Sequence, residues 1–389
     1  MRMASPELVD RMTVDYFMWN TYVEGGLCPM GEPVRLPAKE LEELALLSER
    51  LAGLIERTVD MVLADRELLD WYGFSPALRE MIAAERPRAP VTLARYDAFR
   101  TPRGWLFSEF NCDVPGGVHE AAGLNDLVIG DPSRFRVVPL LTEALCAERV
   151  RPAVAVCYAS GYGEDLEQCQ FLRRAWNRRG LRAILCNPEN LVFDGRDLRV
   201  FGEKVDAVYR FFPGEWLAEV DNFDRILAAS RAGRLRMING FSALVAQSKK
   251  TMALWHERLD RFSPDDRRLI TSHVPRTGTF RREDLGRYRG ERERLVVKRQ
   301  FGRVGEEVLM GCACTDGEWA DWLGWPASEP GEWIVQERFE NRPVEVGGER
   351  LYGCFGPYVV SGRFAGFYTR LARDGFITYD ALIAAVAEA

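Results

Sequence analysis

The most informative part of the sequence is the segment RYDAFRTPRGWLFSEFNCD at residues 95–113. Its middle, residues 101–104, combines proline and glycine in a tight turn, so the stretches on either side are predicted to pair as an antiparallel hairpin. Alternate side chains of a strand share a face. Glu109, Asn111 and Asp113 are therefore expected on one face of the hairpin, and the residues between them are expected to point into the core.

A metal site is one interpretation of this polar face. Asp97 would lie beside Glu109 and Asn111, and two carboxylates crowded against an amide oxygen repel one another unless a cation lies between them. Mg²⁺ takes such oxygen ligands together with the phosphates of a substrate. The other interpretation is a polar face that is simply exposed to solvent, which is the commoner arrangement. Asn111 is a poor strand former in a hairpin rich in aromatic side chains, and it favours the metal site.

The composition is that of a folded, soluble protein. Hydrophobic residues make up 47% of the 389 residues, which is enough for a sizeable core in one large domain or in two to three packed ones. The amino-terminal residues have no signal-peptide pattern, and no apolar run is long enough to span a bilayer. A net charge of −6 argues against electrostatic binding to nucleic acid. We therefore expect a cytoplasmic protein whose partners include neither a membrane nor a nucleic acid.

Residue counts disfavour several catalytic centres. The nine cysteines are scattered, and Cys312 and Cys314 are too closely spaced for a zinc site, so the cysteines are expected to be reduced and buried. With three histidines, a histidine-rich metal centre is excluded. Lysine is rare among the 52 basic residues, which makes each lysine a mild candidate for a role that arginine cannot fill. Codon bias explains the shortage equally well.

The periodicity divides the chain into three regions. Residues 37–79 repeat apolar side chains at three and four positions, as an amphipathic helix or helix pair does, and residues 121–147 contain short helical pieces. Residues 153–186 read as a strand, a helix and a second strand, which predicts a parallel βαβ unit. The remaining predictions are a hairpin at 192–198, a strand at 205–211, a helix at 242–259, and strands at 295–298, 333–337, 358–362 and 364–370.

Lys298 ends an apolar strand and is followed by a glycine-rich turn, Gly302-Arg303-Val304-Gly305. Backbone N–H groups in such a turn approach phosphate oxygens closely, and a lysine on a rigid strand supplies a fixed positive charge. The chain has no Walker motif, so this turn is the candidate phosphate-binding loop. An ordinary hairpin turn after a surface lysine is the alternative, and it is favoured when the turn is considered alone.

Gln336 and Glu337 end a second apolar strand. Side-chain acceptors and free backbone groups at such a position suit the edge of an adenine ring and its ribose hydroxyls. A strand that simply reaches the surface is also common. The order of these elements along the chain is more specific than any one of them.

That order resembles the glutathionylspermidine synthase family, whose ATP-grasp fold is circularly permuted. The resemblance rests on Arg95-x-Asp97 followed by Glu109-x-Asn111, on Lys298 with its glycine-rich turn, and on a closing Tyr368-Thr369-Arg370 strand. It implies an α+β chain with a helical region and metal-binding hairpin at 1–149, a small α/β pre-ATP-grasp domain at 150–236, and the ATP-grasp domain at 237–389.

The resemblance also implies the cofactors ATP and Mg²⁺ and assigns roles to residues. Asp97, Glu109 and Asn111 would bind Mg²⁺, and Arg95 and Arg370 would stabilise the acyl-phosphate and the tetrahedral intermediate. The nucleotide would be held by Lys298, one of Lys249 and Lys250, the loop residues Gly302, Arg303 and Gly305, and Gln336 and Glu337.

The implied activity is an ATP-dependent carboxylate–amine ligase that forms an amide through an acyl-phosphate. The residues after Asn111 lack the serines with which the family binds glutathione, so glutathione and spermidine are not the expected substrates. Two alternatives remain open: a ligase that loads an amino acid onto the thiol of a carrier protein, and a nucleotide-binding protein without catalysis.

Overall fold

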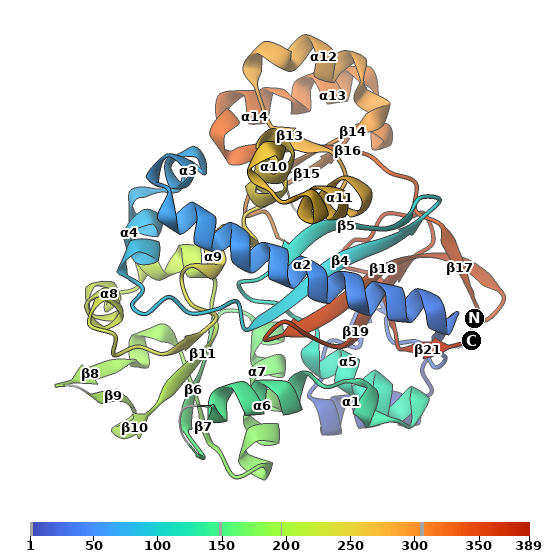
Figure 1. Cartoon of the computed structure of the whole chain (residues 1–389). Helices are drawn as coiled ribbons and strands as arrows, with labels where there is room; N and C mark the ends of the chain where they lie inside the picture. Colours follow the sequence, from blue (N-terminus) through green and yellow to red (C-terminus); the bar gives the residue numbers. More distant parts are fainter. Residues whose placement is uncertain (1–2, 148–149, 196, 304–306) are drawn as a thin grey trace.

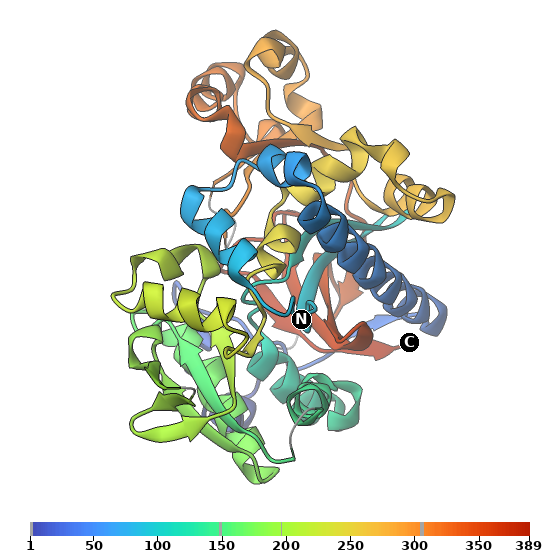
Figure 2. The same cartoon turned by 60° about the vertical axis from the view of Figure 1, so that its left-hand side comes forward.

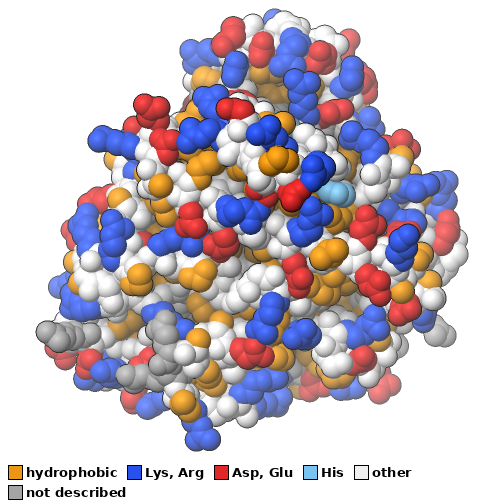
Figure 3. All heavy atoms as spheres, in the orientation of Figure 1, with side chains coloured by type: hydrophobic (Ala, Val, Ile, Leu, Met, Phe, Trp, Pro, Cys, Tyr) orange, Lys and Arg blue, Asp and Glu red, His pale blue; other side chains and the backbone are white. Residues whose placement is uncertain are grey.

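The computed structural model describes residues 3–147, 150–195, 197–303 and 307–389. Helices and sheets are mixed along the chain, as the sequence predicted, and three sheets form the body of the molecule (Figure 1). A central antiparallel sheet lies between a small sheet with its own helices and a parallel α/β unit. On the face shown in Figure 3, basic and acidic side chains are interspersed.

The central sheet joins two distant parts of the chain. Its strands run in the order β20-β19-β18-β4-β5, and β17 also pairs with β18. The predicted hairpin is confirmed as β4 and β5, and β4 pairs with β18. The strands are β4 (Leu93–Thr101), β5 (Gly104–Asn111), β17 (Pro343–Val346), β18 (Glu349–Val360), β19 (Arg363–Ala372) and β20 (Leu382–Ala384).

The predicted amphipathic segment forms the long helix α2 (Ala38–Ala64), which lies across the central sheet (Figure 2). Leu44, Leu51 and Val59 recur on one face of the helix and are fully buried. This burial removes an apolar stripe from water, at about 1.5–3 kcal/mol for each large side chain, and fixes the helix on the sheet.

The small sheet has the order β13-β16-β14-β15. One face is covered by short helices, whose Trp319 packs with Val297 and Trp333 of the sheet. The strands are β13 (Thr277–Thr279), β14 (Leu295–Arg299), β15 (Val308–Met310) and β16 (Trp333–Glu337), and the helices are α12 (Leu285–Gly290), α13 (Asp316–Trp322) and α14 (Gly324–Ser328).

The predicted βαβ unit is confirmed. Its two strands, β6 (Ala153–Tyr158) and β7 (Arg182–Cys186), pair in parallel and are joined by α7 (Gly163–Arg178). β11 (Ala207–Phe211) and β12 (Met237–Ile238) extend this sheet. A separate three-stranded sheet contains β8 (Val192–Asp194), β9 (Asp197–Val200) and β10 (Glu203–Val205).

The remaining elements connect these sheets. Near the two ends of the chain, β21 (Val386–Glu388) pairs in parallel with β3 (Val34–Leu36). The other helices are α1 (Pro6–Tyr16), α3 (Arg66–Trp71), α4 (Pro76–Ala84), α5 (Val118–Leu124), α6 (Val137–Cys146), α8 (Phe223–Arg231) and α11 (Pro264–His273), and the other strands are β1 (Tyr22–Val23) and β2 (Gly26–Leu27). Among the described residues, no helix combines the length and the apolar character needed to cross a membrane.

The helix predicted at 242–259 is divided in two, which corrects the sequence prediction. α9 (Ala243–Gln247) ends at Ser248, which has extended backbone angles, and α10 (Lys250–Glu257) begins two residues later. The Ser248 hydroxyl accepts a hydrogen bond from the backbone N–H of Lys250. In a continuous helix that N–H would bond to a backbone carbonyl, so the Ser248 side chain competes with helix formation here. The break directs the two neighbouring lysines to different places.

Asp113 is also not where the strand pattern placed it. β5 ends at Asn111, and the Asp113 carboxylate turns into the interior, where it pairs with Arg210. It also accepts a hydrogen bond from the Gly214 N–H at 2.9 Å and contacts Arg303 at 3.1 Å. Burial alone would raise the pKa of Asp113, but the Arg210 and Arg303 charges outweigh this effect and lower the pKa.

We expect Asp113→Ala to destabilise the protein by about 3–5 kcal/mol, because it leaves the Arg210 guanidinium buried without its counterion. The Asp113 and Arg210 side chains are 0% and 1% exposed, so water cannot replace the lost partner. The urea midpoint of unfolding measures this loss. Glu80→Ala, which breaks an exposed pair with Arg231, is the control and should leave the midpoint nearly unchanged. An unchanged midpoint for Asp113→Ala would contradict the assigned role.

Candidate active site between two sheets

The hairpin register brings the predicted metal ligands together. Asp97 lies directly opposite Glu109, and Arg95 lies opposite Asn111. These side chains are half-buried, whereas Phe110 between them is 2% exposed and packs in the core. The expected division of the strand into a polar face and a core face is therefore confirmed for residues 109–111.

Asp97 is the centre of an ion-pair cluster. The Arg370 Nη2 atom lies 2.7 Å from one Asp97 oxygen, and the Arg95 Nη2 atom lies 3.6 Å from the other. The Asn111 amide donates a weak hydrogen bond to Asp97 at 3.4 Å. Burial would raise the pKa of Asp97, but the charges of Arg370 and Arg95 prevail and lower the pKa, so the carboxylate is ionised at neutral pH.

Lys249 reaches the second carboxylate. Its Nζ atom lies 3.0 Å from Glu109 Oε1 and donates a hydrogen bond to the Gly302 carbonyl at 2.7 Å. The break between α9 and α10 makes this reach possible, because the Lys249 N–H bonds to the Gln300 carbonyl instead of extending a helix. Of the two adjacent lysines, Lys249 is thus the one beside the predicted metal ligands.

Lys298 connects the small sheet to the central sheet. Its Nζ atom donates to Gln336 Oε1 at 2.9 Å on the neighbouring strand β16 and to the Ser108 carbonyl of β5 at 3.3 Å. Burial lowers the pKa of Lys298 to about 8, although the nearby Glu109 charge opposes this shift. The Lys298 ammonium group is therefore buried close to the predicted metal ligands, and its positive charge is only partly balanced by the negative charge of those ligands.

Three other predicted residues point elsewhere. The Lys250 Nζ atom donates to the carbonyls of Trp71 and Tyr72, each at 2.9 Å, away from the hairpin. Glu337 follows Gln336 in the strand, so its side chain lies on the opposite face of the small sheet from Lys298. Arg303 pairs at 2.6 Å with its partner Glu215.

The glycine-rich loop is only partly described. The Gly302 carbonyl contacts Lys249, as described above, and Gly305 lies outside the described residues. The sequence reasoning missed Arg210 and Glu215, whose ion pairs fix Asp113 and Arg303 beside the site. An arginine inside the apolar strand Ala207–Phe211 was the one available signal, because a buried charge needs a partner.

The charge balance of the site favours an anionic ligand. Two carboxylates, Asp97 and Glu109, are surrounded by four basic groups, which belong to Arg95, Lys249, Lys298 and Arg370. Among the described residues, the buried Arg95 Nε atom has no hydrogen-bond partner. Phosphate oxygens would satisfy that donor and balance the excess positive charge.

The same residues fit Mg²⁺ on such phosphates. In the described part of the chain, no cluster of three or more His, Cys, Asp or Glu side chains could hold a metal by itself. Asp97, Glu109 and the amide oxygen of Asn111 offer an incomplete set of hard oxygen ligands. Mg²⁺ completes sets of this kind with substrate phosphates and water.

We expect Mn²⁺, a paramagnetic substitute for Mg²⁺, to bind at least ~tenfold more weakly to the free protein than to the protein with a non-hydrolysable ATP analogue. The reason is that the Lys249 and Arg370 charges occupy the two carboxylates until phosphates attract these side chains away. Electron paramagnetic resonance of unbound Mn²⁺ measures this difference, with protein-free analogue as the blank. Lys249→Met should raise the affinity for Mn²⁺ without nucleotide. Equal affinity in both states would contradict this account.

The chain resembles known proteins in sequence and in fold. The sequence matches the family described as glutathionylspermidine synthase preATP-grasp over residues 17–383. No curated protein sequence matches the chain. Among solved structures, the chain is similar to a putative gamma-glutamylcysteine synthetase from Methylobacillus flagellatus, with 14% identity and a TM-score of 0.48 over 92% of this chain and 90% of that one.

A second structure resembles the chain over nearly its whole length. It is a glutathione synthetase-like effector from Globodera pallida in its apo form, with 9% identity and a TM-score of 0.66 over 99% of this chain and 98% of that one. At this identity the likeness shows a shared fold. The family match covers nearly the same span and includes the hairpin, Lys298 and Arg370. The chain therefore belongs to the glutathionylspermidine synthase preATP-grasp family.

Proposed function

We propose that the protein is an ATP-dependent carboxylate–amine ligase, which forms an amide bond through an acyl-phosphate and releases ADP and phosphate. One observation carries this proposal. Two carboxylates and Asn111 on a hairpin of the central sheet meet four basic side chains, and one of these, Lys298, reaches them from the small sheet. This cluster suits the joining of two anions, a carboxylate and the γ-phosphate of ATP.

The first step, phosphorylation of the substrate carboxylate by ATP, brings two negatively charged groups together. The substrate carboxylate and the γ-phosphate repel each other, and Lys298 and Lys249 would reduce that repulsion by binding phosphate oxygens. Asp97, Glu109 and Asn111 would hold Mg²⁺, which supplies further charge neutralisation on the phosphates when bound. The buried position of Lys298 strengthens its interaction with phosphate because little water screens it.

Arg95 and Arg370 would act at the acyl group. The Arg370 fork contacts Asp97, and the Arg95 side chain is held by the Gly116 carbonyl at 2.8 Å and lies over the Tyr368 ring. A positioned guanidinium stabilises the oxyanion of the tetrahedral intermediate formed when an amine attacks the acyl-phosphate. Its bidentate geometry is not reproduced by lysine.

The acceptor amine must lose a proton before it attacks, and the first turn of α7 offers a carboxylate that could act as the base for this step. Burial raises the pKa of Asp165 to about 7, and the neighbouring Glu164 charge adds to that effect. A carboxylate with this pKa can accept a proton from an ammonium group near neutral pH. The Arg303 charge opposes this shift.

We also propose that the fold is a circularly permuted ATP-grasp with the boundaries 1–149, 150–236 and 237–389. The hairpin at 93–111 precedes the small sheet in sequence but pairs with β18, near the carboxyl terminus. A permuted chain order produces this arrangement, in which an early hairpin completes a sheet formed by late strands.

The test is to incubate the protein with ATP, Mg²⁺ and pools of amino acids and amines and to measure phosphate release. Release that requires both an acid and an amine, with an amide product detected by mass spectrometry, would support the ligase. A second incubation adds a carrier protein, and phosphate release that requires an acid and the carrier-protein thiol would assign a thioester-forming enzyme instead. Tight binding of ATP without phosphate release in any pool would favour a non-catalytic nucleotide-binding protein.

A further inference from the structure

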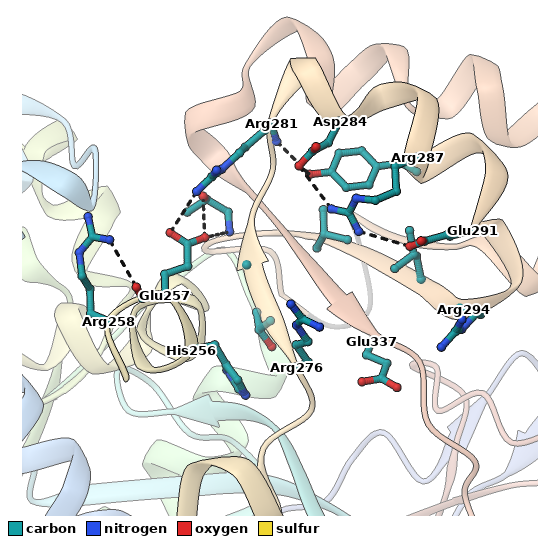
Figure 4. Close-up of a pocket in the computed structure, with 16 residues that line it drawn as sticks. His256, Glu257, Arg258, Arg276, Arg281, Asp284, Arg287, Glu291, Arg294 and Glu337 are labelled. Carbon is teal, nitrogen blue, oxygen red and sulfur yellow. Dashed lines mark hydrogen bonds and ion pairs between the residues drawn. The ribbon is translucent and has the colours of Figure 1, made fainter. Parts of the chain in front are cut away.

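A second candidate site lies on the small sheet, outside the cluster described above. It is a cavity of about 830 Å³ between the end of α10, strand β13 and helix α12 (Figure 4). Leu295 and Val335 form part of its apolar wall, and charged side chains surround the rest. None of the residues assigned to the metal or to the phosphates lines this cavity.

Strand alternation places the apolar wall of the cavity and Glu337 on the other face of the sheet from Lys298. Successive side chains of β14 point to opposite faces of the sheet, so Leu295 shares a face with Val297 and not with Val296. Val297 packs beneath the covering helices. In β16, Val335 lies on that same face, whereas Gln336 points toward Lys298. A ligand bound against this wall and Glu337 would therefore be separated from the predicted nucleotide phosphates by the sheet.

Most charged groups around the cavity have partners. Arg281 lies 3.7 Å from Glu257, and Arg287 lies 3.3 Å from both Asp284 and Glu291. These pairs, drawn with dashed lines in Figure 4, form the upper wall. Because each of these arginines already faces a carboxylate, this wall offers little net charge to a ligand.

Three charged side chains at the ends of adjacent strands have no such partner. Among the described residues, no hydrogen bond or ion pair is formed by the side chains of Arg276, Glu337 and Arg294. Backbone bonds fix them in a row: the Glu337 N–H bonds to the Arg276 carbonyl at 2.7 Å, and the next N–H bonds to the Arg294 carbonyl at 2.8 Å. Figure 4 shows Glu337 between the two arginines.

This row presents a cation, an anion and a second cation across about 10 Å, the width of three adjacent strands. We propose that the cavity binds a small zwitterion in which one ammonium group lies between two carboxylates, as in an amino acid with an acidic side chain. The arginines would bind the carboxylates through bidentate hydrogen bonds, and Glu337 would bind the ammonium group. Burial lowers the pKa of the nearby His256, so that ring adds no further positive charge at neutral pH.

The cavity is connected to the candidate active site through the sheet. Thr277 lines the cavity, and its hydroxyl accepts a hydrogen bond from Gln336 Nε2 at 3.1 Å. The amide oxygen of the same Gln336 accepts from Lys298 at 2.9 Å. A ligand that shifts β13 would therefore change the contacts of Lys298, which gives the site a route for altering nucleotide affinity.

Three probes distinguish the proposed ligand from simpler anions. We would titrate L-glutamate, glutarate and inorganic pyrophosphate by calorimetry into protein that is saturated with Mg²⁺ and a non-hydrolysable ATP analogue, so that the candidate active site is filled. L-Glutamate should bind at least ~tenfold more tightly than glutarate, which lacks only the ammonium group. Glu337→Gln should remove most of that preference, and Arg276→Ala or Arg294→Ala should weaken L-glutamate by ~tenfold or more.

Arg289→Ala is the matched control, because Arg289 is an exposed arginine of α12 that does not line the cavity. It should leave the affinity for L-glutamate unchanged. Equal binding of L-glutamate and glutarate, or tighter binding of pyrophosphate, would overturn the zwitterion proposal. Binding that survives Arg276→Ala and Arg294→Ala would place L-glutamate at another site, for example as a substrate of the proposed ligase. Failure of the ATP analogue to bind would count against the proposed function and not against this cavity.

Discussion

Asp97→Asn is expected to lower kcat/KM for ADP release by about 10³-fold or more, a loss of about 4 kcal/mol in transition-state stabilisation. Asp97 is a predicted metal ligand and is also the carboxylate that Arg370 and Arg95 both approach. The amide keeps the shape of the side chain but removes the charge. Both guanidinium groups then lose their counterion, and the metal loses a ligand.

Two measurements separate this loss from a failure to fold. Glu109→Gln removes the other predicted carboxylate ligand, whose side chain is 19% exposed and pairs with Lys249. Both variants should weaken the binding of Mn²⁺ in the presence of the ATP analogue while the circular dichroism spectrum stays native. Asp10→Asn, at an exposed position on α1, should retain full activity. Full ATP turnover by Asp97→Asn would show that the metal assignment is wrong.

Local sequence was sufficient to predict the hairpin, but not its exact pairing. The tight turn fixes which residues lie opposite each other as far as Ala98 and Phe107, and spacing alone would then place Asp97 opposite Ser108. A β-bulge between Asp97 and Ala98 shifts the register by one residue and brings Asp97 opposite Glu109.

The βαβ unit and the strand that ends with Glu337 were predicted because their apolar patterns are continuous. The strand that contains Lys298 was predicted from its apolar pattern in the same way. Together with the hairpin, these two strands contain the predicted metal ligands, Lys298 and Gln336.

The remaining geometry depends on contacts between distant segments. The break at Ser248, which separates Lys249 from Lys250, is stabilised by hydrogen bonds to Gln300, more than 50 residues away in sequence. Helix propensity gives no sign of such a break. Asp113 could not be separated from the metal-binding face, because its partner Arg210 lies in a different sheet.

Strand alternation could have been applied to Gln336 and Glu337 from sequence, but it required knowing which face the nucleotide occupies. Adjacent residues of a strand point to opposite faces, so their side chains cannot both contact one ring. The hydrogen bond between Gln336 and Lys298 identifies the face that belongs to the candidate active site. The Glu337 side chain belongs to the cavity on the other face, and its backbone N–H bonds to the Arg276 carbonyl.

The second large effect concerns pH. Lys298 has a pKa of about 8, lowered by burial, and the charged or titratable groups around it are Glu109, Lys249, Asp97 and Cys354. Phosphate oxygens stabilise the protonated amine, so bound nucleotide raises this pKa. Below pH 8 the free protein already carries the proton, and above pH 8 it must take one up. We therefore expect nucleotide affinity to be nearly constant between pH 7 and 8 and to fall by up to ~tenfold for each pH unit above 8.

Calorimetric titration of the non-hydrolysable ATP analogue at pH 7.5, 8.5 and 9.5, in buffers of different ionisation enthalpy, measures both the affinity and the proton uptake. Lys250 is the main competing source of such a dependence, because burial also lowers its pKa to about 8. Lys298→Arg discriminates between the two lysines, since a guanidinium stays charged throughout this range. The variant should bind the analogue with an affinity that no longer falls above pH 8. If the affinity of Lys298→Arg for the analogue still fell above pH 8, the titrating group would be a residue other than Lys298. The main support for Lys298 as the phosphate-binding residue would then be lost.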